Sequence, residues 1–261
     1  MKISIITPTF NSQKTINENI NSVLIQSNKN WEQIIIDNLS TDNTLSIIKK
    51  FNNDKIKIIS EKDKGIFDAI NKGIINSTGE IISILHSDDF FFDKNTLTNV
   101  TSNFLNSEIS TVYGNLLYVK KSNKNKVIRY WQSNNFKKGL FYRGWSPPHP
   151  SFFVKKKIYE KFGNYNIEFD NSSDFDLMFR LLEKNQISSK YIDKVLVTMR
   201  YGGASNKSFL NIFKQNLTIL KILGIEKKYI KIIKFVYIKF KERLKQFFIK
   251  PKKMIENDNN I

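Results

Sequence analysis

Residues 81–89, Ile-Ile-Ser-Ile-Leu-His-Ser-Asp-Asp, join a short apolar run directly to two acids. Four large aliphatic side chains among five predict a strand over Ile81–Leu85 that is covered on both faces, as in a parallel sheet. Open α/β sheets bind ligands at the carboxyl ends of their strands, where Asp88 and Asp89 would stand. Adjacent carboxylates repel each other unless a cation lies between them, and hard oxygen ligands suit Mg²⁺ or Mn²⁺. A solvated Asp-Asp turn is the alternative.

The first 90 residues repeat the order strand, then helix. Apolar runs alternate with segments of helical periodicity, and the connections between them are short. The expected strands are 3–7, 33–37, 56–59 and 81–85, and the expected helices are 15–26, one beginning at Ser40-Thr41-Asp42, and 66–75. Such a repeat predicts a parallel sheet with crossover helices. The expected fold class is therefore α/β, with a mostly parallel central sheet flanked by helices.

The middle of the chain changes character. Residues 111–119 and 127–131 predict an antiparallel hairpin. Residues 139–150 contain two Gly, three Pro, Trp145 and His149, which is too irregular for a helix or strand. We interpret this segment as a functional loop, with an ordinary surface loop as the alternative. Asp174 then precedes a helical pattern, where an acid often serves only as a cap.

Composition limits the class of protein. With 261 residues, 40% of them hydrophobic, the chain can bury one large core or two modest ones. Cysteine is absent, which excludes disulfides, thiolate metal sites and thiol nucleophiles and fits a reducing compartment. Residues 1–8 lack the apolar region of a signal peptide, and no window of about 18 apolar residues predicts a membrane span. The expected location is the cytoplasm.

Positive charge is concentrated near the C-terminus. The formal net charge is +18, and residues 207–253 hold fourteen Lys and Arg against two Glu. On a helical wheel of 227–249, one face is apolar and consists of Tyr229, Ile230, Ile233, Val236, Tyr237, Phe240, Leu244, Phe247 and Phe248. The opposite face is basic, although Phe235 and Ile238 interrupt it. This pattern favours binding to an anionic bilayer, and packing on the rest of the protein with solvated lysines is the alternative.

Acids stand where a nucleotide site needs them. Asp37 ends the second expected strand, Asp88 and Asp89 follow the fourth, and Asp174 opens a later helix. A carboxylate at a strand end accepts a base N–H or binds ribose hydroxyls. Each acid taken singly is explained as well by a helix cap or a turn, so only the combination favours a site.

With these motifs, the chain resembles the bacterial family 2 glycosyltransferases of the GT-A type, in the branch that builds O-antigen, capsule and related surface polysaccharides. The resemblance covers residues 1 to about 205. Its motifs, in family order, are Ser-Ile-Ile-Thr-Pro-Thr-Phe-Asn (4–11), Ile-Ile-Asp (35–37), Ser-Thr-Asp-Asn-Thr (40–44), the run 61–73 that includes Asp63-Lys64-Gly65, Thr-Gly-Glu (78–80), His-Ser-Asp-Asp (86–89) and Ser-Asp-Phe-Asp-Leu with Arg (173–177 and 180). The implied fold is the GT-A, Rossmann-like sheet with a C-terminal basic amphipathic extension.

The resemblance implies a role for each matching residue. The ends of the first two expected strands would hold the nucleoside of a nucleotide sugar. A charged turn, residues 63–65, would border the donor, and the Asp-X-Asp position would lie at the diphosphate. The residues so implied are Thr7, Pro8, Thr9 and Asp37 for the nucleoside, Asp63, Lys64 and Gly65 for the donor border, and His86, Ser87 and Asp88 for the Asp-X-Asp position. Asp88 would ligate Mn²⁺ or Mg²⁺, and Asp174 would act as the general base. Arg200 is implied to close over the diphosphate, with a plain turn as the alternative.

Two positions depart from the family pattern. His86 replaces the first acid of the Asp-X-Asp motif, and Leu39 stands where glycine is frequent. The family's metal-binding His after the acid-base helix is absent, so either His149 substitutes for it or Asp88, the diphosphate and water hold the metal. We favour the second, because Mg²⁺ usually keeps several waters. Asp89 is then a supporting neighbour.

The implied activity is that of an inverting hexosyl- or N-acetylhexosaminyltransferase. It would move a sugar from a UDP-sugar or related donor to a hydroxyl of a growing, lipid-linked surface glycan, peripherally at the inner face of the cell membrane. The alternatives are a nucleotidyltransferase, disfavoured because residues 7–11 contain no Gly, and an inactive carbohydrate- or membrane-binding relative. No nucleic-acid-binding motif is present. We expect a transferase domain over 1–205, the extension over 206–253 and a disordered tail over 254–261.

Overall fold

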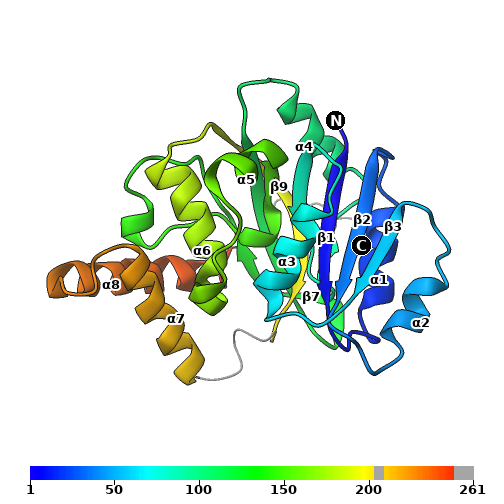
Figure 1. Cartoon of the computed structure of the whole chain (residues 1–261). Helices are drawn as coiled ribbons and strands as arrows, with labels where there is room; N and C mark the ends of the chain where they lie inside the picture. Colours follow the sequence, from blue (N-terminus) through cyan, green and yellow to red (C-terminus); the bar gives the residue numbers. More distant parts are fainter. Residues whose placement is uncertain (203–208, 250–261) are drawn as a thin grey trace, which may run out of the picture.

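The computed structural model describes residues 1–202 and 209–249 (Figure 1). Within these ranges nine strands form one sheet in the order β3-β2-β1-β4-β8-β6-β9-β5, with β7 paired to β6. The strands are β1 Ile3–Thr9, β2 Trp31–Asp37, β3 Ile56–Ser60, β4 Ile81–Ile84, β5 Phe90–Phe91, β6 Thr111–Lys120, β7 Asn123–Trp131, β8 Phe152–Lys155 and β9 Ser189–Arg200. The expected 254–261 tail and the boundary near 205 lie outside the described residues.

The first four strands are parallel and carry the expected crossover helices. These helices are α1 Ile16–Leu24, α2 Thr44–Lys49 and α3 Ile66–Ile75. Alternate residues of β2 face opposite layers, since Ile35 packs against α1 and α2 while Ile34 and Ile36 pack against α3. Both faces are covered, which is why every residue of β1, β2 and β4 is buried. The predicted α/β class is confirmed.

Pro8 does not end the first strand. The strand was expected to stop at Thr7, but β1 continues to Thr9, with Pro8 opposite Ile36 of β2. A proline removes one backbone donor without bending the chain, since its fixed φ lies close to extended values. The two extra residues carry the side chain of Thr9 to the same level as Asp37.

The second half of the sheet is mixed. The predicted hairpin is β6 and β7, and β8 runs antiparallel to both β4 and β6. Its helices are α4 Thr96–Phe104, α5 Lys156–Phe162, α6 Ser173–Met178 with a π-helical continuation Phe179–Lys184, and short 3-10 turns at Phe141–Arg143, His149–Ser151 and Ile167–Ser172. The expected loop over 139–150 thus contains one of these turns and leads into a second. No helix of the described chain is long and apolar enough to cross a membrane.

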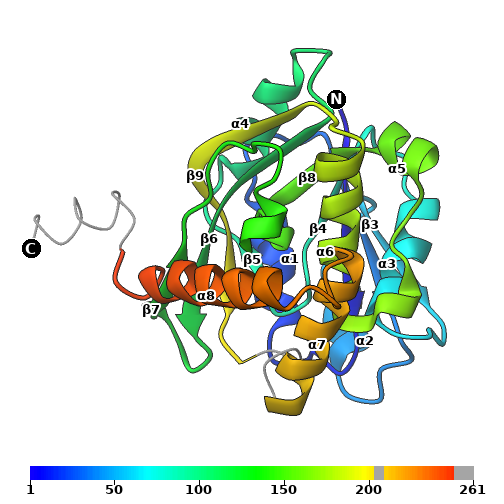
Figure 2. The same cartoon turned by 90° about the vertical axis from the view of Figure 1, so that its left-hand side faces the viewer.

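Two further helices, α7 (Phe209–Ile222) and α8 (Tyr229–Lys245), pack on this domain. Ile219 and Leu220 of α7, and Leu223 just after it, are buried in the same cluster as side chains of α6. Figure 2 shows α8 crossing the molecule from α7 towards the β6–β7 hairpin. At its far end, the Gln246 carbonyl accepts a hydrogen bond of 2.8 Å from the backbone N–H of Tyr130.

The apolar face of α8 points outward. Its nine residues, as predicted from the helical wheel, are between 43% and 85% exposed. Phe235, one of the two residues that interrupted the basic face, is instead the anchor, 1% exposed and joined in the core by its partly buried neighbour Ile232. Gly144 lets the helix approach, because a Cβ there would lie 2.8 Å from the Cβ of Lys239. Helix α8 therefore packs on the domain through a narrow strip and leaves its apolar face free.

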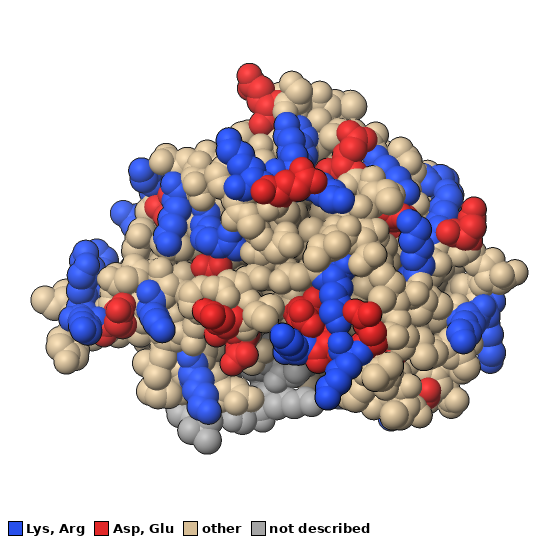
Figure 3. All heavy atoms as spheres, viewed as in Figure 1, with Lys and Arg blue, Asp and Glu red and all other residues tan. Residues whose placement is uncertain are grey.

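Basic and acidic side chains are interspersed on the face seen in Figure 3. Among the described residues drawn there, the charge forms no field of a single sign of the kind that attracts nucleic acid.

Candidate functional site

Asp37 occupies the end of β2 between two neighbouring strand ends. The sheet register places it beside Thr9 of β1 and Ser60 of β3. Its fully buried carboxylate accepts hydrogen bonds from the Ser60 hydroxyl at 2.7 Å and from the Ser40 backbone N–H at 3.0 Å. The Ser40 hydroxyl donates a third, at 2.5 Å. These bonds hold the acid in one orientation at the carboxyl edge of the sheet.

The two threonines of β1 differ in their surroundings. The Thr7 hydroxyl accepts a hydrogen bond of 3.0 Å from the Gln33 amide inside the core. The Thr9 hydroxyl is buried without a hydrogen-bond partner in the described chain. A buried hydroxyl without a partner is costly, so Thr9 is the residue of this pair whose side chain is available to a ligand.

The loops after β1 and β4 are joined by side chains. The hydroxyls of Ser12 and Ser87 lie 2.8 Å apart. The Asn19 amide donates to the carbonyl of His86 at 2.8 Å and to that of Asp89 at 2.9 Å. These bonds fix the backbone of the His-Ser-Asp-Asp motif against α1. Ser12 and Asn19 were not singled out in the sequence, where a polar residue on a helix carries no distinguishing signal.

Leu39 is held in a left-handed backbone conformation at the mouth of this edge. Its φ is +53°, which is uncommon for a residue with a Cβ, and its side chain is 52% exposed. This left-handed backbone explains why glycine, which adopts it readily, was expected at position 39. Strained residues of this kind persist where the surrounding structure determines the backbone.

The charged turn at 63–65 lies beside Asp37. Asp63 is close enough to Asp37 to feel its charge, and burial raises the pKa of the Asp63 carboxyl above its usual value. Its carboxylate accepts a 2.8 Å hydrogen bond from the Gly65 N–H, where a φ of +122° requires glycine. Lys64 is exposed next to them. The structure thus brings Asp63 and Asp37 to one end of the sheet.

Asp88 and Asp89 have different environments. The Asp88 side chain is partly buried and makes no hydrogen bond to another side chain of the described chain. Asp89 is fully buried, and neither oxygen of its carboxyl group has a hydrogen-bond partner there. Burial, followed by the charge of Asp88, raises the pKa of Asp89 well above its usual value. Asp89 is therefore an internal acid rather than a solvated turn residue.

Arg200 connects the end of β9 to this loop. Its guanidinium donates to the Asp88 carbonyl and forms an ion pair with Glu18 of α1. It also lies over the Phe90 ring, 5.2 Å from the centroid. Through these contacts Arg200 holds the backbone of Asp88 in place. Glu18 was missed in the sequence, because its partner is 182 positions away.

The only two histidines of the chain meet in the site. The rings of His86 and His149 are arranged edge to face with centroids 5.8 Å apart. Nδ1 of His149 lies 3.1 Å from an Asp174 carboxylate oxygen. The other oxygen of Asp174 accepts the Phe175 N–H at 2.7 Å. Asp174 is thus both the first acid of α6 and the partner of a histidine that reaches the Asp-Asp loop.

His86 is neutral in this arrangement. Burial, followed by the proximity of His149, lowers the pKa of His86 to about 3. Its Nδ1 is buried without a hydrogen-bond partner in the described chain. A neutral imidazole offers one donor and one acceptor, so His86 can replace the missing acid as a hydrogen-bonding group but not as a charge.

The acids suit a divalent cation that takes few of its coordinating groups from the protein and most of them from a bound molecule and water. No group of three His, Asp or Glu residues within the described ranges forms a ready metal cage. Asp88 supplies one partly exposed carboxylate without a side-chain partner, and Mg²⁺ or Mn²⁺ held there would take its remaining ligands from phosphate oxygens and water. Nδ1 of His149 is paired with Asp174, so this nitrogen is not offered to a metal.

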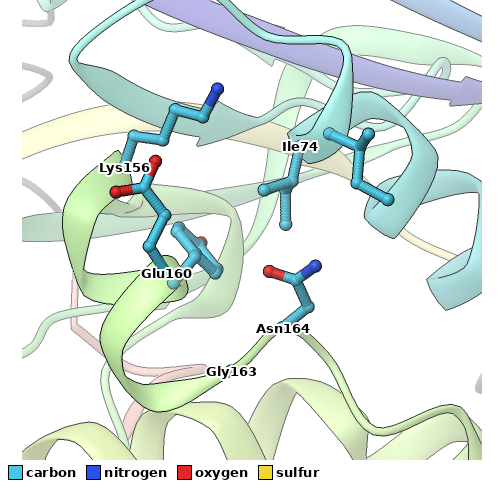
Figure 4. Close-up of a pocket in the computed structure, with 7 residues that line it drawn as sticks. Ile74, Lys156, Glu160, Gly163 and Asn164 are labelled. Atoms are coloured by element: carbon cyan, nitrogen blue, oxygen red, sulfur yellow. The ribbon is translucent and has the colours of Figure 1, made fainter.

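A separate hollow of about 300 Å³ lies between α3 and α5, with Ile74, Lys156, Glu160, Gly163 and Asn164 among its lining residues (Figure 4). It is beside the end of α3, where the chain turns to enter β4. It therefore belongs to the opposite edge of the sheet from the acids described above.

Comparison with known proteins gives matches over most of the chain. A family model described as glycosyl transferase family 2 matches residues 4–162. A Mycobacterium tuberculosis protein named PGL/p-HBAD biosynthesis glycosyltransferase is 27% identical over 227 residues, which are 85% of this chain and 86% of that protein. The Escherichia coli UDP-Glc:alpha-D-GlcNAc-diphosphoundecaprenol beta-1,3-glucosyltransferase WfgD is 35% identical over 127 residues, 48% of this chain and 49% of that protein.

Solved structures share the fold. The crystal structure of S. aureus TarS has a TM-score of 0.66 at 18% identity and covers 92% of this chain and 72% of its own. A TarS complex with UDP-GlcNAc has a TM-score of 0.62 at 16% identity and covers 91% and 79%. The mannosyltransferase PcManGT from Pyrobaculum calidifontis, in complex with GDP-Man and Mn²⁺, has a TM-score of 0.59 at 18% identity and covers 85% and 63%.

Proposed function

Because the chain belongs to glycosyl transferase family 2, we propose that it transfers a sugar from UDP-sugar donors to a hydroxyl of a lipid-linked surface glycan, with inversion at the anomeric carbon. One observation carries this proposal. Asp174 is held by His149, which in turn contacts the histidine beside Asp88. A base for the acceptor and a carboxylate for the leaving group therefore share one site.

Asp37, Thr9 and Asp63 bind the nucleoside in this proposal. The fixed carboxylate of Asp37 retains lone pairs for a base N–H, since its bonds to Ser40 and Ser60 use three of about four acceptor sites. The unpartnered Thr9 hydroxyl gains a bond on binding. The UDP-GlcNAc complex of a structural neighbour and the UDP-Glc in the name of WfgD support a uridine nucleotide.

Asp88 is the proposed ligand of Mn²⁺ or Mg²⁺. Such a cation, when bound, acts as a Lewis acid that stabilises charge on the departing diphosphate. The chain's own residues fix the backbone at Asp88, because Arg200 donates to the Asp88 carbonyl and Asn19 donates to the Asp89 carbonyl. The Mn²⁺ complex of PcManGT supports a divalent metal.

Asp174 is the proposed general base. Its carboxylate takes the proton of the acceptor hydroxyl as the oxygen attacks the anomeric carbon and the nucleoside diphosphate leaves. A single displacement of this kind inverts the configuration. His149 Nδ1, 3.1 Å from one Asp174 carboxylate oxygen, keeps the acid oriented in this proposal, while the Phe175 N–H donates to the other oxygen.

A panel of nucleotide sugars tests the donor class. We expect UDP-sugars to raise the melting temperature of the full chain in Mn²⁺, because a ligand at 100 times its Kd stabilises the folded state by about 2.7 kcal/mol. The measurement is differential scanning fluorimetry with UDP-, GDP- and ADP-sugars, with EDTA as the control. Protection by none of them, or equal protection in EDTA, would contradict the proposed donor site.

The outward face of α8 suits the surface of an anionic bilayer. Large apolar side chains are exposed along its length, among them Ile233 and Phe240, and exposed lysines such as Lys231, Lys234 and Lys241 flank them. The apolar side chains would enter the interface while each lysine contributes about 1 kcal/mol of attraction to anionic lipid. We include peripheral membrane binding in the proposal because the lipid-linked acceptor in the name of WfgD would lie in the same membrane.

The double variant Ile233→Ser/Phe240→Ser tests this surface. Each large apolar side chain withdrawn from water contributes roughly 1.5–3 kcal/mol, so we expect binding to anionic vesicles to weaken about 100-fold. Leu105→Ser/Ile75→Ser is the matched control, since both side chains are at least 70% exposed elsewhere. Co-sedimentation with phosphatidylglycerol vesicles measures the effect. Unchanged binding in the double variant excludes the face, and self-association that the variant abolishes would assign it to a second copy of the chain.

A further inference from the structure

Three cations gather between α8 and the β6–β7 hairpin. They are Arg129 of β7 and Lys239 and Arg243 of α8, here called the α8 cation cluster. Arg129 is only 6% exposed, and its guanidinium lies over the rings of Tyr118 at 4.6 Å and Trp131 at 5.2 Å. Its Nε donates to the Gln246 side chain at 2.7 Å. Arg129 is thus fixed from both the hairpin and the end of the helix.

Lys239 is fixed in a similar way. The backbone and Cβ of Lys239 lie against Gly144, and its Nζ donates to the Asn216 side-chain oxygen at 2.9 Å. Arg243 follows one helical turn later, is partly buried, and interacts electrostatically with both Lys239 and Arg129. The three side chains are therefore held near one another rather than extended into solvent.

Among the described residues, the cluster has no paired carboxylate. Within residues 1–202 and 209–249, no carboxylate lies within 4.0 Å of a cationic nitrogen of Arg129, Lys239 or Arg243. Burial and the nearby Arg243 lower the pKa of Lys239 to about 8, and burial also lowers that of Arg129. Holding like charges together away from water is unfavourable, and a bound anion reverses that cost.

Tyr118 lies within electrostatic range of both the cluster and the acids of the candidate site. Burial raises the pKa of this tyrosine, and the charges of Arg129, Asp89, Arg243 and Asp174 also act on it. Lys239 also interacts with Asp174. Lys239 therefore lies within electrostatic range of the proposed base, on the helix whose outer face is apolar.

We propose that the α8 cation cluster binds the phosphate groups of a lipid-diphosphate-linked acceptor while its hydroxyl approaches Asp174. This inference rests on the proposed transferase function and names the anionic part of its acceptor. Guanidinium groups suit phosphate because they donate two hydrogen bonds in a plane. The bilayer headgroups are the weaker candidate, since the cluster faces the domain while Lys231, Lys234 and Lys241 remain exposed for them.

Binding of farnesyl diphosphate by the full chain tests the cluster. The titration is followed by calorimetry in EDTA, so that no divalent metal recruits the probe to the donor site, and farnesol is the uncharged comparison. We expect Arg243→Gln and Lys239→Gln each to weaken binding of farnesyl diphosphate about tenfold and to leave that of farnesol unchanged. Lys50→Gln and Lys126→Gln remove the same charge from exposed positions outside α8 and are expected to bind as the wild type does.

Three results would overturn the proposal. One is equal binding of farnesyl diphosphate by the wild type, Arg243→Gln and Lys239→Gln. A second is loss of binding in Asp88→Asn, which would place the probe at the donor site. A third is a loss of binding to phosphatidylglycerol vesicles in both cluster variants that is as large as their loss of binding to farnesyl diphosphate. That result would assign the cations to lipid headgroups. Thermal protection by UDP-sugars is measured on the same proteins. Absence of this protection in the wild type would contradict the donor hypothesis without deciding whether the cluster binds the farnesyl probe.

Discussion

Replacing Asp174 with Asn is expected to lower sugar transfer by about 10²–10⁴-fold and to leave UDP binding unchanged. The amide keeps the size of the side chain and can still accept the Phe175 N–H. It cannot accept a proton from the attacking hydroxyl, so the loss falls on the chemical step. The measurement is kcat at saturating donor, with the Kd for UDP in Mn²⁺ as the control for an intact fold.

His149→Gln provides the graded companion to Asp174→Asn. Glutamine can donate one hydrogen bond but does not hold the His149 geometry against Asp174, so we expect a loss in kcat of about tenfold, the size of one hydrogen bond to a charged group. An Asp174→Asn protein that transfers sugar at the wild-type rate would reduce Asp174 to a residue at the start of α6. An effect of His149→Gln that exceeds that of Asp174→Asn would move the base to the histidine.

Replacing Asp88 with Asn is expected to remove the metal dependence of donor binding and to lower transfer by roughly 10²–10³-fold. Stabilising the departing diphosphate is worth several kcal/mol, and each 1.36 kcal/mol is tenfold in rate. Asparagine keeps one oxygen but no charge, and the backbone bond from Arg200 to the Asp88 carbonyl is unaffected. Titrating Mn²⁺ against UDP-sugar protection measures the change.

Asp54→Asn is the matched control for Asp88→Asn. Asp54 is exposed in the turn before β3, so its replacement removes the same charge from the amino end of a strand, away from the carboxyl edge that holds Asp88. We expect its Mn²⁺ dependence to match that of the wild type. Identical Mn²⁺ dependence in Asp88→Asn and the wild type would exclude Asp88 as the metal ligand and leave Asp89, with its unpartnered carboxyl group, as the next acid to replace.

The parallel half of the fold was predictable because its signals are local. Each strand there is a short aliphatic run and each helix an amphipathic one, so α3 was placed with its observed bounds, 66–75. Strand β8 was missed because it is four residues long and follows the Pro-rich loop directly. Strand β9 was missed because its first half carries Lys and Asp on a partly exposed surface. Pairing with β6, 78 positions away in sequence, stabilises it as a strand.

The acids of the candidate site were predictable from the sequence, but the residues that hold those acids in place were not. Asp37, Asp88 and Asp174 follow from strand ends and helix starts, which the sequence marks. The pairing of His149 with Asp174 depends on a loop and a helix meeting in space, and the sequence offered only a metal role for that histidine, as the less favoured alternative. For α8, the apolar face of the wheel is exposed in the structure, whereas Phe235, which lay on the basic face of the wheel, packs into the core. Which face packs was decided by Phe235 and by the room above Gly144, which are tertiary features.

The meeting of the two histidines has a practical consequence. Since the chain contains no others, every imidazole resonance in a proton or nitrogen spectrum of the whole protein arises from His86 or His149. One ring reports on the loop of Asp88 and the other on Asp174. The protein therefore carries two natural spectroscopic reporters at the candidate site, and neither requires an engineered probe.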